Sequence, residues 1–287
     1  MIKKGIILAG GLGTRMSPVT KSINKQLLPI YDKPLIFYPL SILMLAGIRE
    51  ILIIVNKGSI NQFKKILLNG ENLGIKIKYA EQDKPRGLPD AFKIGKNFIK
   101  NENIALILGD NFFYGQSLSE KLQKIIKLKK GATILVHPVK NPNQFGVVTM
   151  KGNKIVNLIE KPKKTKSNLA ITGLYFFDNS VVKKTLNLKK STRNEFEIID
   201  LLKIYKKKNN LKVEHLGRGA AWLDAGTIDD FNQTSIFVSS IEKRQGLKIA
   251  CLEEIAYSKK WINKNKIKKA ILFYGNCEYS KYLKKLI

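Results

Sequence analysis

The sequence predicts an α/β protein with a mixed, mostly parallel sheet, and three observations carry this prediction. Short apolar runs with the length of buried strands recur in the first half of the chain, at residues 5–9, 51–55 and 104–108. Helical patterns separate these runs, as the crossover connections of parallel strands require. Closer-spaced strand patterns follow Gly131, at residues 132–137, 146–150, 155–159 and 169–177, with a hairpin-type turn at 151–153. The second half therefore predicts an inserted, smaller sheet.

Helices are predicted between and after these strands. The first, at residues 34–46, has a proline near its first turn and stops before Gly47, as helix termini favour. Further helical patterns lie at residues 60–68, 117–128, 195–205, 229–241, 255–264 and 279–287. Neither a repeat nor a flexible linker interrupts the chain. We therefore expect a single domain over residues 1–287, with a helical tail at residues 228–287.

The composition is that of an ordinary globular protein. Of the 287 residues, 44% are hydrophobic and 26% charged, so the chain can bury a core without disulfides or structural metals. No apolar run approaches the roughly 20 residues of a membrane helix, and the start lacks a signal-peptide pattern. We expect a cytoplasmic protein without a membrane partner. Cys251 and Cys277 have no neighbours at zinc-ligand spacing and are interpreted as reduced and structural.

The net charge of +30 is unusual and raises the question of a nucleic-acid partner. Only six of the 52 basic side chains are arginine, whereas proteins that read nucleic acids favour arginine for bidentate contacts. No nucleic-acid-binding motif accompanies the lysines. The excess is better explained by lysines on solvated faces, without a specific nucleic-acid partner, although it should attract anionic substrates and polyanions.

A glycine-rich turn follows the first predicted strand, in the segment 8–15 with the sequence LAGGLGTR. Such a turn lets the backbone approach a phosphate and presents N–H groups to an anion. It does not complete the dinucleotide fingerprint of a dehydrogenase, because Met16 occupies the position of the third glycine. Arg15 and Lys25 add two cations, which suit a triphosphate better than a nicotinamide cofactor.

Two aspartates are candidate metal ligands. Asp110 follows the strand at 104–108, at the edge where open α/β sheets bind ligands, and Asp224 ends a Trp-Leu-Asp segment. If folding brings the two together, they form an oxygen-rich Mg²⁺ site that also contacts phosphates. Taken alone, Asp110 is equally compatible with a helix cap or a turn.

Glu160 and Lys161 precede a proline at the end of the strand at 155–159. A lysine fixed there can bind a sugar phosphate, and the glutamate can accept hydrogen bonds from sugar hydroxyls. The alternative is a surface ion pair between the two side chains, which is common in a lysine-rich protein.

Taken together, these segments resemble the sugar-phosphate nucleotidylyltransferase family, and within it the members that use dTTP. The likeness covers nearly the whole chain in order. It is carried by GIILAGGLGTR, NKQLLPIYDKPLIFYPLSILMLAGIREILII, LGDNFFYG, FGVV, EKP, KSNLAITGLYFFD, EIID, GRGAAWLDAGT, RQGLK and EEIAY. The KQLLPIYDKP stretch is very specific, and the pairing of GDN with WLD is moderately so.

The resemblance implies a Rossmann-like nucleotidyltransferase core with an inserted sugar-binding sheet and a helical C-terminal segment, assembled as a homotetramer. Residues 1–130 would mainly bind the nucleotide, residues 131–227 the sugar phosphate, and residues 228–287 would serve assembly or regulation. The implied reaction joins dTTP and glucose 1-phosphate, with Mg²⁺ as cofactor, and feeds deoxysugar synthesis of the rhamnose type.

The resemblance also assigns roles to individual residues. The predicted nucleotide-binding residues are Gly10, Gly11, Gly13, Thr14, Arg15, Lys25, Gln82 and Gly87, of which the last two would read the base. The predicted sugar-phosphate site consists of Gly146, Glu160, Lys161, Thr172 and Glu195. Asp110 and Asp224 would bind Mg²⁺. The cations Arg15, Lys25 and Lys161 would carry the catalysis, because the reaction needs charge and positioning rather than a covalent nucleophile.

The sequence departs from the family pattern at several positions. In the stretch 82–91 the family more often reads Gln-x-x-Pro-Asp-Gly-Leu-Ala-Gln-Ala, so Arg86, Pro89 and Asp90 are atypical beside the base pocket. Further departures are Phe145, Asn194 and Ala225. A regulatory nucleotide site at a subunit contact is a further expectation, near Tyr114, Gly115, Arg218 and Glu254.

Three alternatives remain open at this point. The same reaction could use UTP or another hexose 1-phosphate, and the base pocket around Gln82 would decide between the nucleotides. A non-enzymatic polyanion-binding protein would explain the charge but not Asp110, Asp224 and Lys161. A nicotinamide-dependent oxidoreductase is disfavoured by the incomplete glycine fingerprint.

Overall fold

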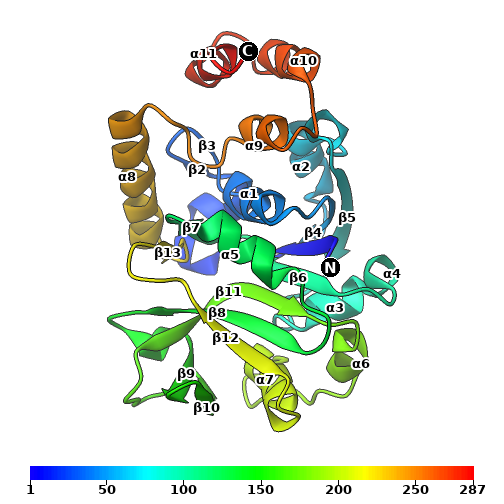
Figure 1. Cartoon of the computed structure of the whole chain (residues 1–287), viewed down its shortest axis with the longest axis vertical. Coiled ribbons are helices and arrows are strands. Elements are labelled where there is room, and N and C mark those ends of the chain that lie inside the picture. Colours follow the sequence, from blue (N-terminus) through cyan, green and yellow to red (C-terminus); the bar gives the residue numbers. More distant parts are fainter.

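The computed structural model describes all 287 residues and contains a nine-stranded mixed sheet covered by helices on both faces (Figure 1). Its parallel part consists of β6 (Ile104–Leu108), β1 (Lys4–Ala9), β4 (Glu50–Asn56) and β5 (Lys76–Gln82), in this spatial order. The register of β1 with β6 places Leu8 opposite Leu108, so both strands end at the same edge. The predicted α/β class is confirmed.

The second half extends this sheet with antiparallel strands. β11 (Leu169–Phe177) runs antiparallel to β6 and also pairs with β8 (Ala132–Pro138) and β9 (Gly146–Lys151). β10 (Lys154–Glu160) forms a hairpin with β9, and β12 (Leu211–His215) lies parallel to β8. The β9–β10 hairpin lies at the end of the molecule opposite the C-terminal helices (Figure 1). The inserted sheet is therefore continuous with the main one.

Two large apolar clusters bury the two faces of the sheet. Alternate residues of β1 contribute to both, since Ile7 belongs to one cluster and Ile6 to the other. Helices on the first face are α1 (Phe37–Ala46), α2 (Ile60–Leu67), α5 (Leu118–Ile125) and α9 (Leu252–Ser258). Helices on the second face are α3 (Asp90–Ile94), α4 (Lys96–Ile99), α6 (Val181–Leu186) and α7 (Ile198–Lys207).

Several predicted helix boundaries are wrong; the helix expected at 195–205, for example, begins at Ile198. The helix expected at 34–46 begins at Phe37, because Pro34 belongs to a small hairpin of β2 (Pro29–Ile30) and β3 (Lys33–Pro34). The helix expected at 255–264 does not exist as one element. Lys260 adopts a left-handed φ of 58°, after α9 has ended, and Asn263 then caps a new helix. That helix is α10 (Lys264–Tyr274), and α11 (Glu278–Lys284) follows it.

A two-stranded ribbon connects the sheet with the long helix α8 (Ile228–Gln245). It pairs β7 (Asn111–Tyr114), which follows β6 directly, with β13 (Ala221–Asp224) in antiparallel register. Asp224 thereby lies opposite Asn111, next to Asp110, across 114 residues of sequence. None of the helices combines the length and the hydropathy that crossing a lipid bilayer demands.

Candidate active site

A cleft of about 610 Å³ lies at the carboxyl edge of the parallel strands, between the glycine-rich turn and the inserted sheet. Most of the predicted site residues line it, namely Gly11, Arg15, Gln82, Gly87, Asp110, Gly146, Glu160, Lys161, Glu195 and Asp224. Ligands of open α/β sheets bind at this edge because several strands end there side by side. The fold therefore brings together residues of both predicted halves in one cavity.

The glycine-rich turn is held in place by side chains from neighbouring segments. Gly13 has a left-handed φ of 61°, and a Cβ there would lie 2.9 Å from the Thr20 side chain. The Thr20 hydroxyl donates a hydrogen bond to the Gly13 carbonyl at 2.8 Å, and Asn56 Nδ2 donates to the Gly11 carbonyl at 3.2 Å. Gly10 and Thr14 belong to the same turn without lining the cleft.

Two cations lie beside the two aspartates, Arg15 from the glycine-rich turn and Lys25 from the short helical turn at Lys25–Leu27. Lys25 is buried, at 6% exposure, and its Nζ lies 2.5 Å from Asp110 Oδ2. Arg15 packs against Gly226, where a Cβ would come within 2.8 Å of a guanidinium nitrogen. Charged groups of opposite sign therefore meet where the glycine-rich turn adjoins the segment after β13.

The two aspartates carry the oxygen ligands that a magnesium ion would need. Burial, and next to it the negative charge of Asp110, raise the pKa of Asp224 to about 7, while Lys25 and Arg15 oppose this shift. Such mutual repulsion is what a divalent cation relieves. Mg²⁺ in phosphoryl-transfer sites is commonly held by one or two carboxylates, with phosphate oxygens and water completing the shell. Asp110 and Asp224 would be the protein ligands.

Asn111 is a site residue that was missed in the sequence. Its side chain is 1% exposed, and its Oδ1 accepts hydrogen bonds from the Gly173 N–H at 2.9 Å and from Trp222 Nε1 at 2.6 Å. Its Nδ2 donates to Asp110 Oδ1 at 3.2 Å. One amide thus ties β7, β11 and β13 together and orients a predicted metal ligand.

The part of the cleft next to β9 and β10 contains a half-buried carboxylate, Glu160, beside the unpaired cation Lys161. Burial, with the nearby charge of Glu197, raises the pKa of Glu160, whereas Arg193 and Lys161 lower it in part. Lys161 lines the cleft, has a left-handed φ of 42° and forms no ion pair with the protein. Gly146 allows a close approach, since a Cβ there would lie 3.3 Å from Glu160 Oε2.

Arg193 is the second residue that the sequence did not reveal. Its Nη2 donates to Glu197 at 2.8 Å and to Glu160 at 3.4 Å, and Ser191 holds Glu197 from the other side at 2.6 Å. The guanidinium therefore fixes Glu160 in the wall of the cleft. The predicted Thr172 is fully buried, and its hydroxyl donates to the Leu135 carbonyl at 3.1 Å, outside the cleft.

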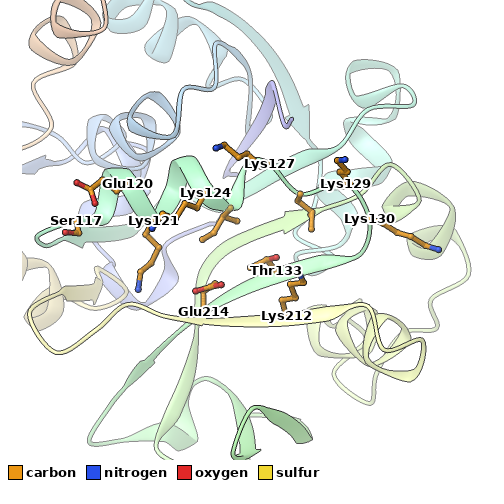
Figure 2. A pocket seen from close by; sticks show the side chains of 12 residues that line it. Ser117, Glu120, Lys121, Lys124, Lys127, Lys129, Lys130, Thr133, Lys212 and Glu214 are labelled. Atoms are coloured by element: carbon orange, nitrogen blue, oxygen red, sulfur yellow. The ribbon is translucent and has the colours of Figure 1, made fainter.

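A second hollow, of about 580 Å³, lies between α5 and the strands β8 and β12 (Figure 2). We call it the lysine groove, after Lys121, Lys124, Lys127, Lys129, Lys130 and Lys212. None of these lysines forms an ion pair within the protein. The groove lacks a glycine turn and aromatic side chains for stacking bases, so the first cleft is the better candidate for a nucleotide.

The residues expected at a regulatory site lie in two places. Gly115 closely approaches Ala220, where a Cβ would come within 2.8 Å of the Cα, and Arg218 is exposed in the adjoining turn. Tyr114 OH donates to Gln245 at 3.4 Å. Glu254 lies on α9 and accepts a hydrogen bond from Tyr282.

Comparison with known proteins agrees with this geometry. The nucleotidyl transferase family matches residues 4–240. The glucose-1-phosphate thymidylyltransferase of Neisseria meningitidis is 48% identical over 99% of both chains, and that of Mycobacterium tuberculosis is 45% identical over 99% of both. The chain therefore belongs to the nucleotidyl transferase family and is a nucleotidyltransferase. Its full-length relatives are glucose-1-phosphate thymidylyltransferases, which confirms the resemblance found in the sequence.

Solved structures show the same fold. A glucose-1-phosphate thymidylyltransferase from Bacillus anthracis, described in complex with sucrose, has a TM-score of 0.76 and 35% identity, with 82% of this chain and 94% of that chain covered. A UDP-glucose pyrophosphorylase in complex with UDP-glucose has a TM-score of 0.73 and 26% identity, with 85% of this chain and 100% of that chain covered. The Rossmann-like nucleotidyltransferase core with its inserted sheet is therefore confirmed.

Proposed function

We propose that the protein transfers the deoxythymidylyl group of dTTP to glucose 1-phosphate, giving dTDP-glucose and pyrophosphate. The names of the full-length relatives support this substrate pair. The observation that carries the proposal is that Arg15, Asp110, Asp224 and Lys161 line one cleft, with Lys25 paired to Asp110 at its edge. This arrangement can hold two phosphorylated substrates end to end.

The proposed chemistry is an in-line displacement. A phosphate oxygen of glucose 1-phosphate attacks the α-phosphorus of dTTP, the bond to the β-phosphate oxygen breaks, and pyrophosphate leaves. Lys161 would bind the sugar phosphate, whereas Arg15 and Lys25 would hold the triphosphate and stabilise the charge on the leaving group. The attacking oxygen is already ionised, so no general base is required.

Mg²⁺ bound by Asp110 and Asp224 would supply further neutralisation of phosphate charge. Glu160, oriented by Arg193, would accept hydrogen bonds from sugar hydroxyls. The proposal also includes a homotetramer, a cytoplasmic location and a place in rhamnose-type deoxysugar synthesis. Light scattering on the purified protein would measure the assembly, and omission of Mg²⁺ should abolish turnover.

The first experiment measures pyrophosphate release from dTTP and from UTP, each with glucose 1-phosphate and Mg²⁺. We expect faster release from dTTP, and a loss of at least about 100-fold in Asp110→Asn because a metal ligand is removed. Asp83→Asn, at an exposed position, is the matched control and should retain activity.

Each other outcome has a defined meaning. Faster release from UTP would refute the thymidylyl proposal and support the uridylyl alternative, which the similarity to a UDP-glucose pyrophosphorylase favours. Release with another hexose 1-phosphate but not with glucose 1-phosphate would change the sugar. If no triphosphate releases pyrophosphate while random DNA binds with steep salt dependence, the polyanion-binding alternative would replace the proposal.

A further inference from the structure

The side-chain amide of Gln82, at the end of β5, is held by Asp90 at the start of α3. Gln82 Nε2 donates to Asp90 Oδ2 at 3.1 Å, and the two side chains are only 5% and 3% exposed. A carboxylate offers acceptor atoms only, whereas an amide carries a donor group and an acceptor on opposite sides. The amide nitrogen must therefore face Asp90, and Gln82 Oε1 must face away from it.

Gln82 Oε1 is open to the nucleotide end of the cleft. It lies against Gly10, where a Cβ would come within 2.6 Å of it. No protein group donates a hydrogen bond to this oxygen. The oxygen is nevertheless not completely buried, since it is absent from the set of inaccessible side-chain atoms that lack a partner. Because Gln82 lines the cleft, the exposed side of this oxygen faces the ligand space. A ligand that brings a hydrogen-bond donor would satisfy it.

Gly87 supplies a second free group on the same wall. Its backbone N–H makes no hydrogen bond within the protein. Gly87 has a left-handed φ of 99°, which favours glycine. A side chain would not fit there either, because a Cβ would lie only 2.1 Å from the Phe196 carbonyl oxygen. The wall of the cleft thus presents one acceptor and one donor to a base.

This pair matches the imide edge of thymine and uracil, in which an N3–H donor adjoins carbonyl acceptors. Cytosine has the opposite pattern, because its N3 accepts and its exocyclic N4 donates. If the Gln82 amide could rotate by half a turn, its Nε2 would donate to the cytosine N3 and remove this part of the discrimination, while the fixed Gly87 N–H would still oppose the N4 amino group. Rotation would place Gln82 Oε1 against the Asp90 carboxylate and leave two buried acceptors facing each other.

We propose that Asp90 is a positioning residue that makes the enzyme select pyrimidines with an N3–H, thymine and uracil over cytosine, by fixing the orientation of the Gln82 amide. Asp90 does not line the cleft itself and acts through Gln82 alone. The inference rests on the proposed function, because it concerns the base of the nucleotide substrate.

The test compares kcat/KM for dTTP and dCTP, at saturating glucose 1-phosphate, in the unmodified enzyme and in Asp90→Asn. Asparagine can pair with either rotamer of the Gln82 amide, so the dTTP to dCTP ratio should fall by at least about ten-fold. The KM for glucose 1-phosphate should stay unchanged. A general structural defect would instead change this KM as well. Asp83→Asn makes the same charge change at an exposed position and should keep the original ratio.

Two further measurements keep the inference falsifiable. Asp90→Ala frees the amide altogether and should lower the ratio in the same direction. The unmodified enzyme should use N3-methyl-dTTP at least about ten-fold less efficiently than dTTP, because the methyl group removes the donor. Unchanged ratios in folded Asp90 variants, or equal use of N3-methyl-dTTP, would overturn the inference. Absence of turnover with both dTTP and UTP in the unmodified enzyme would instead refute the proposed function.

Discussion

Replacing Asn111 with alanine should destabilise the whole protein, because its amide is 1% exposed and accepts two hydrogen bonds. The substitution leaves the Gly173 N–H and the Trp222 indole N–H without an acceptor. A buried donor without a partner costs about 1–3 kcal/mol, so the two together should lower the free energy of unfolding by about 2–6 kcal/mol. Domains are typically stable by only about 5–15 kcal/mol, so the loss should be large.

Urea denaturation followed by tryptophan fluorescence measures this loss, and Trp222 reports directly from the affected place. Asn101→Ala, in an exposed turn, is the matched control and should change stability by no more than about 0.5 kcal/mol. The reasoning would be refuted if Asn111→Ala lost less than about 1 kcal/mol. Activity of the surviving folded protein should also fall, because Asp110 loses the hydrogen bond that orients it.

Two further predictions concern the sugar site and the C-terminal tail. Arg193→Lys should raise the KM for glucose 1-phosphate about ten-fold and leave the KM for dTTP unchanged, because an ammonium cannot bridge Glu197 and Glu160 as a guanidinium does. Steady-state assays measure both constants. The prediction would be contradicted if the variant and the unmodified enzyme had the same KM for glucose 1-phosphate. Burial raises the pKa of Glu253 above 4.5, although hydrogen bonds from Tyr279 and other groups oppose the shift. Stability from Glu253 is therefore full below pH 4.5 and is lost as pH rises through the raised pKa. The difference in Tm between Glu253→Gln and the unmodified protein (variant minus unmodified) should then be larger at pH 8 than at pH 5. The same difference at both pH values would contradict this prediction.

The buried strands could be predicted from sequence, whereas two of the edge strands, β5 and β12, could not. Residues 5–9, 51–55 and 104–108 are apolar throughout because both faces of the sheet are covered there. β5 and β12 were not predicted, because lysines and glutamates alternate with their apolar residues. Such side chains fit the margins of the sheet, where β5 is the last strand of its row and one face meets solvent.

The metal pair illustrates a limit of a different kind. Each aspartate was a candidate on its own, but only the β7–β13 ribbon brings Asp224 to Asp110, and a pairing across so many residues has no local signature. Arg193 had no signature at all, since it lies in an irregular loop without helical or strand periodicity. Its role follows only from the packing of that loop against β10.

Lys161 shows how the structure decides between two interpretations that the sequence left open. The alternative of a surface ion pair between Glu160 and Lys161 is wrong, because Glu160 pairs with Arg193 and no carboxylate lies within ion-pairing distance of Lys161. Lys25 is the opposite case, since its ammonium is already neutralised by Asp110. Most lysines of this protein lack an ion-pair partner, so it is the position of Lys161 in the wall of the cleft that would make its charge available to an anionic ligand. In the proposed reaction Lys161 would meet a substrate phosphate directly, and Lys25 would do so while still paired with Asp110, because an ammonium carries three hydrogen-bond donors.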